Sequence, residues 1–485
     1  MKRLLLFTAG LLLCTPAVFA QFEQDYTPLV LSGNIPAAFI PQGRETVQRS
    51  TPGKREGNLS RREQQAFLTT TNYALKAALQ SGAVLFNDSL SNYVQLVADK
   101  ALIGAPKLRE KVNIYVTRYT VPNASAWRDG TIFINVGLLS KLQSEAQLAF
   151  VICHEAAHVQ KRHVLRNYQK KKEIEKSNRR KAISFSQVSE ATELDQLIHL
   201  LRYRKRYEFE ADKYGFEIFQ ASGYRLAAAV DVMDVLAQIN LGQRDSTLAA
   251  HLTNNGAYPF ALAAPLDLDS IFATTGYTLE ANLACFERAP ASEADDELST
   301  HPSIADRRAV LVGLSAAAGT STGDVDNYYG APTFDYFRTL AAFEEVARSV
   351  QLMAYSESMF RSLELLARFP QNQYLHEVVA TSLYWLAFYD DLNSVDNVVP
   401  EVSEVVVSNH ARVICLLEHA AKANEFGALA EHYFTYAQEK FPACDLFPFL
   451  QLRLQQLQGE TPDYQPFFER FPSSVFRNYP TTSSK

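Results

Sequence analysis

Residues 153–163 read CHEAAHVQKRH and directly follow the apolar run LAFVI. Ser144 and Gln147 form an S-x-x-Q pattern just before that run, which predicts the start of a helix. We therefore expect the whole stretch to lie inside one long helix. An apolar helix face seldom carries three histidines and a glutamate without a reason, so this stretch is the first candidate for a functional site.

His154 and His158 are four residues apart, so on a helix both imidazoles lie on one face and can point at one metal ion. Glu155 would then lie to the side of the metal, where a carboxylate can take a proton from bound water and pass it to a leaving amine. The spacing predicts a zinc site, which needs a third protein ligand and an open position. The alternative is a pair of helix histidines with ordinary hydrogen bonds.

The third ligand is not obvious from this stretch alone. A metzincin pattern would need glycine at position 160 and histidine at position 164, where the chain has Gln160 and Val164. His163 is five residues past His158, which turns it about 140° away from the ligand face of a continuous helix. We expect His163 to support the site rather than to bind the metal.

The remaining candidate lies in RYEFEADKYG, on a second predicted helix. Glu208 and Asp212 share one face of that helix, so one carboxylate can bind zinc while the other orients a ligand histidine. Glu210 points elsewhere. The alternative is a solvated acidic face balanced by Arg204 and Arg206.

Three motifs together resemble one family: HEAAHVQKRH, then E-F-E-A-D-x-x-G, then STHP with an arginine six positions after its histidine. They are similar to the HtpX and CAAX-prenyl-protease group of gluzincin zinc metallopeptidases (peptidase family forty-eight). The similarity covers about residues 60–315 and is greatest to exported soluble members of BepA and LoiP type. It implies zinc ligands His154, His158 and Glu208, catalytic Glu155, and Asp212 behind the ligands.

The same resemblance implies that His301 and Arg307 act near the metal, in oxyanion stabilisation or in gating of the open position. Without it, His301 would be read as a capping residue before Pro302.

The segment PNASAWRDGTIFINVGLL also resembles the family. It implies an edge strand beside the zinc helix, to which an extended substrate adds by backbone hydrogen bonds. The candidate substrate-binding residues are Asn123, Ala124, Ile132 and Ile134. Trp127, Arg128 and Asp129 are bulkier and more charged than the usual segment, so substrate preference is not carried over.

The N-terminus predicts export. MKR precedes the apolar run LLLFTAGLLLC, and AVFA fits a cleavage site, so residues 1–20 are expected to be a signal peptide. Lipidation of Cys14 is disfavoured because Leu13 stands where such signals carry a small residue. No later stretch approaches the roughly 18–20 apolar residues of a membrane span. We expect a soluble periplasmic protein, with association to the outer membrane as the alternative.

Charge and cysteine content exclude other classes. The formal net charge of −6 gives no indication of nucleic-acid binding. The four cysteines after residue 20 are scattered without a CxxC pair, which excludes a cysteine-rich zinc module. Cys153 is expected to pack in the core, and a disulfide between Cys415 and Cys444 is left open.

We expect a mainly α (α+β) fold. An extended arm at 21–60 precedes a zinc metallopeptidase domain with a small β-sheet at 61–315, a linker at 316–339 and a helical domain at 340–485. A basic-Phe-Pro signature recurs at 368–370, 440–442 and 470–472 and favours tetratricopeptide-like helix pairs. The alternative is an ordinary helical domain.

The predicted function is an exported endopeptidase, with one Zn²⁺ per chain, that cleaves misfolded or unassembled envelope proteins in quality control. The helical domain would recruit substrates or an envelope-protein partner. The charged run QKKKEIEKSNRRK stands where membrane relatives carry transmembrane helices, which disfavours a prenyl-protein substrate. A helical-repeat chaperone or assembly adaptor, with a gated and rarely active protease domain, is the alternative.

Overall fold

The structure is a computed structural model and describes residues 20–29, 59–86, 88–184, 190–241, 303–319, 324–400 and 408–479. Residues 1–19 of the predicted signal peptide and His301 lie outside these ranges. The chain divides into two compact units. Among the described residues, one unit holds 29–237 and 303–341, and the other holds 20–28, 238–241 and 342–479.

The first unit contains a three-stranded sheet with the order β1-β3-β2. Strand β1 (Asn113–Thr117) pairs with β3 (Thr131–Asn135) in parallel, and β2 (Ala124–Ala126) pairs with β3 in antiparallel. The alternation of β-branched and aromatic residues in VNIYVTRYT (112–120) and in TIFINV (131–136) predicts two strands, and both are present as β1 and β3. The fold is mainly helical with this small sheet, as predicted.

The sheet order corrects one expectation about substrate binding. Ile132 and Ile134 lie on the central strand, β3, and their side chains are fully buried. Both edges of β3 are already paired, one with β1 and the other with β2. Ile132 and Ile134 therefore offer no free backbone edge. The edge strand that contacts α8 (Glu145–Gln160) is β2, which contains Ala124 and follows Asn123.

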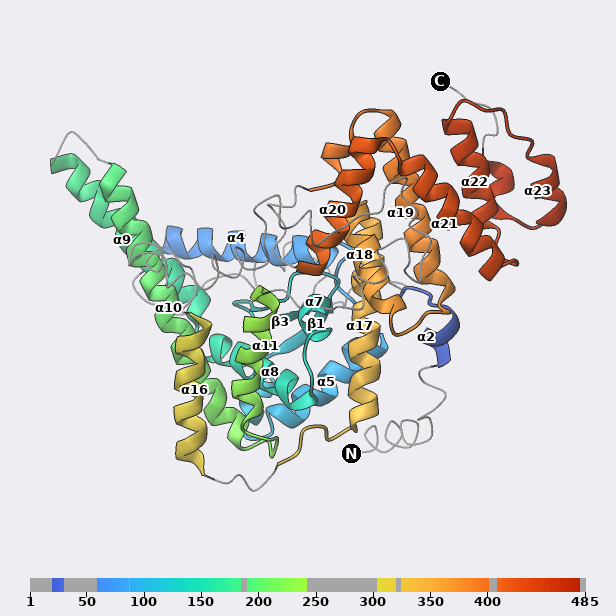
Figure 1. Cartoon of the computed structure of the whole chain (residues 1–485). Coiled ribbons are helices and arrows are strands. Elements are labelled where there is room, and N and C mark those ends of the chain that lie inside the picture. The colour runs from blue at the N-terminus through green and yellow to red at the C-terminus, as the bar shows by residue number, and fades with distance from the viewer. Residues whose placement is uncertain are drawn as a thin grey trace. The chain divides into compact units, whose positions relative to one another are not determined.

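Helix α17 (Ala331–Gln351) is divided between the two units, and nine further helices of the described residues belong wholly or mainly to this one (Figure 1). They are α4 (Arg61–Gln80), α5 (Ser89–Ala101), α6 (Pro106–Arg109), α7 (Val136–Leu139), α8 (Glu145–Gln160), α9 (His163–Ser184), α10 (Glu190–Gln220), α11 (Ala228–Leu241) and α16 (Ile304–Ala318).

Helix α8 begins as predicted but ends earlier. The Ser144 side chain caps it by accepting a hydrogen bond from the backbone N–H of Gln147. The helix stops at Gln160, and Arg162 has a φ of 56°, in the left-handed region. His163 then starts α9. The prediction of one continuous helix through His163 was wrong, because this turn redirects the chain.

Helices α8 and α10 pack together more closely than side chains normally allow. A Cβ placed on Gly215 of α10 would lie 2.9 Å from the Cα and 3.0 Å from the backbone N of His154. Only a residue without a Cβ fits there without a shift of one helix. This glycine ends the E-F-E-A-D-x-x-G motif, and it accounts for the motif's last position.

Glu145, in the first turn of α8, is fully buried and connects this helix to other parts of the unit by hydrogen bonds. It accepts hydrogen bonds from the hydroxyls of Tyr93 (2.9 Å) and Tyr224 (2.5 Å), and from the backbone N–H groups of Tyr328 (3.0 Å) and Tyr329 (3.3 Å). Burial raises the pKa of its carboxyl group. Tyr328 and Tyr329 belong to the predicted linker, 316–339, and lie between the end of α16 and the start of α17 (Ala331–Gln351). This part of the linker is thus fixed to the start of α8.

The second unit is helical in its described part. Its elements are α2 (Ala20–Gln24), the end of α17, α18 (Tyr355–Leu366), α19 (Gln373–Asp391), η1 (Val395–Asn397), α20 (Ser408–Ala423), α21 (Phe426–Lys440), α22 (Leu446–Leu457), α23 (Gln465–Arg470) and η3 (Val475–Asn478).

The N-terminal residues pack into this second unit. Phe22 is fully buried and stacks on Phe343, with ring centroids 5.0 Å apart. The Tyr26 hydroxyl donates to Glu344 at 2.5 Å. Ala20–Gln24 is helical, so the described start of the predicted arm is not extended.

The three basic-Phe-Pro signatures occupy equivalent turns. In each, the phenylalanine N–H closes the end of a helix by donating to a carbonyl four residues back, at 2.8 Å, and its own carbonyl accepts from the residue three positions later. The basic side chain lies over the ring of Phe369, Phe441 or Phe471. These turns end α18, α21 and α23. Tetratricopeptide-type repeats stay a prediction.

The cysteines give no disulfide among the described residues. Cys153 is a buried free thiol, as expected. Cys444 is also free, with its sulfur 3.3 Å from the Glu377 carboxylate, and the side chain of Cys415 lies outside the described part. None of the described helices has the length and apolar character needed to cross a membrane.

Gly215 gives a testable prediction. We expect Gly215→Ala to reduce the free energy of unfolding by about 1–3 kcal/mol, because the new methyl group overpacks the α8–α10 contact. Chemical denaturation followed by circular dichroism measures this. Gly313→Ala is the matched control: Gly313 also lies within a helix, but its added Cβ meets nothing within 4 Å. That variant should be neutral or more stable by about 0.5–1 kcal/mol. Equal stability of the two variants would contradict the close-approach explanation.

Candidate metal centre

Three side chains from two helices converge at one point. His154 and His158 come from α8 and Glu208 comes from α10, and one ligand atom of each lies within 4.8 Å of the others. The two Nε2 atoms are 3.1 Å apart, and the Glu208 carboxylate oxygens are 3.5 Å from His154 Nε2 and 3.6 Å from His158 Nε2. The predicted ligand residues are therefore neighbours in space, although fifty residues separate His158 from Glu208.

The spacing of these groups suits a small tetrahedral cation. Zinc bonds of about 2.0–2.2 Å in tetrahedral geometry place neighbouring ligand atoms about 3.3–3.6 Å apart. The separations of 3.1–3.6 Å, with one Glu208 oxygen beside each histidine, are close to that range. Two imidazoles and one carboxylate are also the donor set of catalytic zinc sites that keep one position open. The residues present fit a zinc ion.

His154 is held from behind by a carboxylate. Its Nδ1 lies 2.9 Å from Asp212, which is fully buried, and Arg307 donates to both Asp212 oxygens at 2.9 and 2.7 Å. Burial lowers the pKa of His154, but the contacts with Asp212 and Glu208 outweigh it and raise this pKa to about 10. Asp212 thus holds the ring with Nε2 turned toward the cluster.

Arg307 contacts both Asp212 and Glu208. Besides its bidentate pair with Asp212, its Nη1 is 3.6 Å from Glu208. Burial disfavours the charge of both carboxylates, yet their ion pairs with His154 and Arg307 outweigh it and lower both pKa values. Two of the Arg307 nitrogens are thus occupied by Asp212. Its expected partner near the metal, His301, lies outside the described residues.

His158 is held by a second histidine. Its Nδ1 is 2.9 Å from Nδ1 of His163. The His163 ring stacks on Tyr207, with centroids 4.6 Å apart, and its Nε2 lies 3.5 Å from Glu210. Arg166 in turn donates to Glu210 at 2.8 Å and lies over the Tyr207 ring. Burial lowers the pKa of His158 to about 3 and that of His163 to about 4, so both rings are neutral.

Sequence reasoning missed three of these residues. Glu210 was set aside because it does not share the face of Glu208, and Tyr207 and Arg166 drew no attention. The signal for Glu210 was its place in EFEAD, two residues from each of the other two acids. Tyr207 and Arg166 carried no comparable signal, because their contacts depend on the turn at Arg162.

Glu155 lies next to the cluster and to the edge strand. It is 8% exposed, and the backbone N–H of Ala126 hydrogen-bonds to its carboxylate. Burial raises its pKa to about 7, against the opposing effect of nearby His154. A carboxyl group with a pKa near neutrality can both accept and return a proton under physiological conditions.

Strand β2 turns some of its backbone groups away from the sheet. In its antiparallel pairing with β3, the Asn123 carbonyl accepts from Asn135 N–H, and Trp127 N–H donates to Thr131. In the alternating pattern of such a pair, Ser125 faces β3 while Ala124 and Ala126 turn their backbone groups away from it. These outward groups lie on the side where Ala126 meets Glu155.

Residues 86–315 match the model of Peptidase family M48. The chain is also similar to two curated proteins. It is 21% identical over 222 residues to a beta-barrel assembly-enhancing protease of Yersinia pestis, covering 43% of this chain and 45% of that protein. It is 24% identical over 164 residues to a putative beta-barrel assembly-enhancing protease of Vibrio cholerae serotype O1, covering 30% and 33%.

The matches thus span less than half of each relative's length. The family match includes both helices that carry the cluster, and its residues 154, 158 and 208 are those that converge in space. Residues 86–315, which carry the cluster, are thus similar to the metallopeptidases of family M48.

Proposed function

We propose that the chain is a zinc-dependent endopeptidase. The observation that carries this proposal is the triangle of His154, His158 and Glu208, with the buried Glu155 carboxyl beside it and an open strand edge against that carboxyl. A zinc site alone would fit a structural role. A carboxyl group of near-neutral pKa next to a strand edge indicates hydrolysis of a polypeptide.

When bound, zinc would polarise the scissile carbonyl and increase the acidity of water at the site. Glu155 takes the proton of the attacking water and later gives it to the leaving amine. The backbone groups of Ala124 and the carbonyl of Ala126 hold the substrate backbone as an added strand, while the Ala126 N–H stays bonded to Glu155, which places the scissile bond beside Glu155. Arg307 and Asp212 act as positioning residues, because they fix His154 and Glu208.

For the substrate, we propose misfolded or unassembled envelope proteins. The support is the name of both relatives, which links them to assembly of beta-barrel proteins, together with the predicted signal peptide at 1–20. The periplasm is then the site of action. The helical unit that includes α18–α23 is proposed to recruit these substrates or an envelope-protein partner.

The metal assignment predicts a measurable stoichiometry. Purified protein should contain about one equivalent of zinc by elemental analysis, and Glu208→Ala should lose most of it because two imidazoles alone bind zinc weakly. Glu217→Ala, an exposed acid on the same helix, is the control and should keep its zinc. Full zinc occupancy in Glu208→Ala would show that another residue is the third ligand.

The catalytic assignment is tested by cleavage of casein. Glu155→Gln keeps the size of the side chain and removes its ability to accept a proton, so we expect cleavage to fall at least about a hundredfold while zinc is retained. A chelator should abolish wild-type cleavage, and added zinc should restore it. Equal cleavage by wild type and Glu155→Gln would exclude the enzyme proposal.

The residues behind His158 give a separate prediction on metal affinity. We expect His163→Ala to weaken zinc binding about 10–100-fold, because His158 loses the partner that fixes its ring. Glu210→Gln should weaken it in the same direction by a smaller factor, and Glu217→Gln serves as its control. Competition with a chromophoric chelator measures the affinity without any assay of activity. Unchanged affinity in both His163→Ala and Glu210→Gln would rule out this positioning role.

A further inference from the structure

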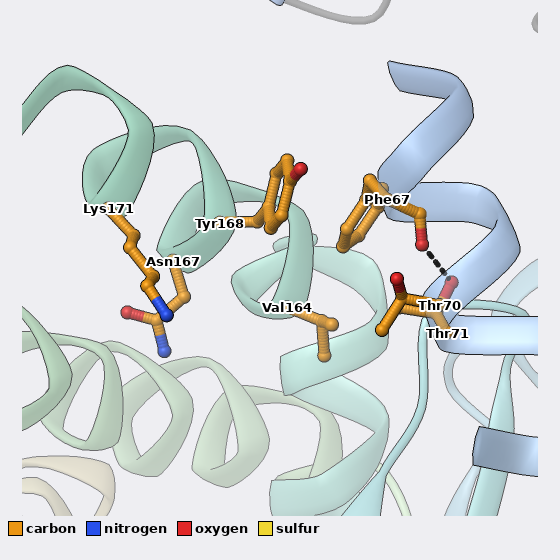
Figure 2. A pocket seen from close by; sticks show the side chains of 7 residues that line it. All are labelled: Phe67, Thr70, Thr71, Val164, Asn167, Tyr168 and Lys171. Atoms are coloured by element: carbon orange, nitrogen blue, oxygen red, sulfur yellow. Dashed lines mark hydrogen bonds between the residues drawn. The ribbon is translucent and has the colours of Figure 1, made fainter. Parts of the chain in front are cut away.

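A pocket of about 320 Å³ lies between α4 and α9, beyond the metal centre. Figure 2 shows its two walls: one helix contributes Phe67, Thr70 and Thr71, and the other contributes Val164, Asn167, Tyr168 and Lys171. Its volume is at the lower end of the range for pockets that hold small organic groups.

The lining is mostly apolar, and two of its three hydroxyl groups are used elsewhere. Thr71 donates to the Phe67 carbonyl at 2.8 Å, so its methyl group is free to face the pocket. The Tyr168 hydroxyl donates to the Glu63 carbonyl, and its ring contacts the Phe67 ring with centroids 4.6 Å apart. The pocket therefore presents aromatic and methyl surfaces, which suit an apolar side chain.

Two polar groups border this apolar surface. Asn167 Oδ1 is buried and has no hydrogen-bond partner within the described part of the chain. Lys171 is exposed, and no ion pair with it occurs among the described residues, whereas its neighbours Lys170 and Lys172 pair with Glu173 and Glu175. A buried amide and an unpaired ammonium group are suited to the backbone and carboxylate of a bound peptide.

A smaller cavity of about 70 Å³ lies next to the larger pocket, and Val164 lines both. Its other lining residues include His158, and Trp127 and Arg128 at the end of the edge strand. Arg162 borders it too. The region between the strand edge and the larger pocket thus contains a histidine of the candidate site and two cationic side chains.

The distance from His158 to the larger pocket suits an extended peptide. His163, the first residue of α9, contacts His158, and the pocket residues occupy the next two turns of α9. The His158 and His163 ring centroids are 4.8 Å apart, and at 1.5 Å of rise per residue the middle of the pocket lies about 7 Å further along α9 than His163. An extended chain advances about 3.3 Å per residue, so it reaches the pocket about three residues from the scissile bond.

We propose that this pocket, here called the α4–α9 pocket, is a specificity subsite for a large apolar side chain of the substrate polypeptide, with an acidic residue next to it. The apolar side chain lies between Phe67, Tyr168 and Val164, and Lys171 binds the neighbouring carboxylate. This inference rests on the proposed peptidase function and adds to it a preference that the metal centre alone does not explain.

The test uses internally quenched decapeptides that differ at one position. A phenylalanine is moved along an alanine background, with aspartate or lysine beside it, and kcat/KM is measured for each peptide. For wild type we expect kcat/KM to be about tenfold or more higher with phenylalanine than with alanine at one position, about three residues from the cleaved bond. Aspartate beside it should exceed lysine severalfold.

Two variants locate this preference in the pocket. Thr70→Trp places a large side chain in the α4–α9 pocket from an exposed position, and the ratio of phenylalanine to alanine should fall to about one. Thr69, the preceding residue, is also exposed but does not line the pocket, so Thr69→Trp should keep the wild-type ratio. Lys171→Glu should reverse the preference for aspartate, whereas Lys76→Glu, an exposed lysine of α4, should not.

The outcomes separate the two proposals. A wild-type ratio retained in Thr70→Trp overturns the subsite, even if all variants cleave peptides normally. Absence of cleavage by wild type overturns the peptidase function. In that case binding decides on the pocket: the Kd values of the phenylalanine and alanine peptides, carrying a fluorescent label, are measured on Glu155→Gln by fluorescence anisotropy. If adding Thr70→Trp removes the difference between the two Kd values, the subsite is supported. If the difference is unchanged, the subsite is overturned.

Discussion

The close approach of α10 to α8 is the constraint on which the candidate site depends. Gly215 lets the backbone of α10 contact the backbone of His154. At that separation the carboxylates one to two turns earlier on α10 reach the imidazoles of α8. Buried carboxylates are costly unless each has a partner, and here Glu208 and Asp212 share His154 and Arg307. The helix contact and the charge network therefore require each other.

Local pattern predicted the parts of this site that depend on one helix. The four-residue spacing of His154 and His158 and the capping pattern at Ser144 need no tertiary information. Glu208 became a candidate only by exclusion of other ligands and by resemblance to a family, because nothing local relates two helices fifty residues apart. The break after α8 carried no signal: Arg162 is in the left-handed region without being glycine or asparagine, so contacts made by His163 with His158 and Tyr207 must hold the turn.

The same limit explains the other differences. The resemblance implied an edge strand in this segment, yet β3 is the central strand of the sheet and all five of its residues are buried. The actual edge, Ala124–Ala126, has only three small residues with weak strand preference. At the N-terminus, Phe22 and Tyr26 stand alone among polar neighbours, and their burial comes from residues more than three hundred positions away. Such contacts leave no periodic trace in the sequence.

The turn at Arg162 also explains how Glu208, Glu210 and Asp212, each two positions from the next, can all contribute to one candidate metal centre. On a helix, Glu208 and Asp212 share a face, whereas Glu210 points about 160° from Glu208. A continuous helix through His163 would leave Glu210 without a role. Because the chain turns, α9 lies beside α10 (Figure 1), and His163 and Arg166 of α9 reach Glu210 while α8 meets the opposite acids. One stretch of α10 thereby supports both histidines: His154 through Asp212, and His158 through Glu210 and His163.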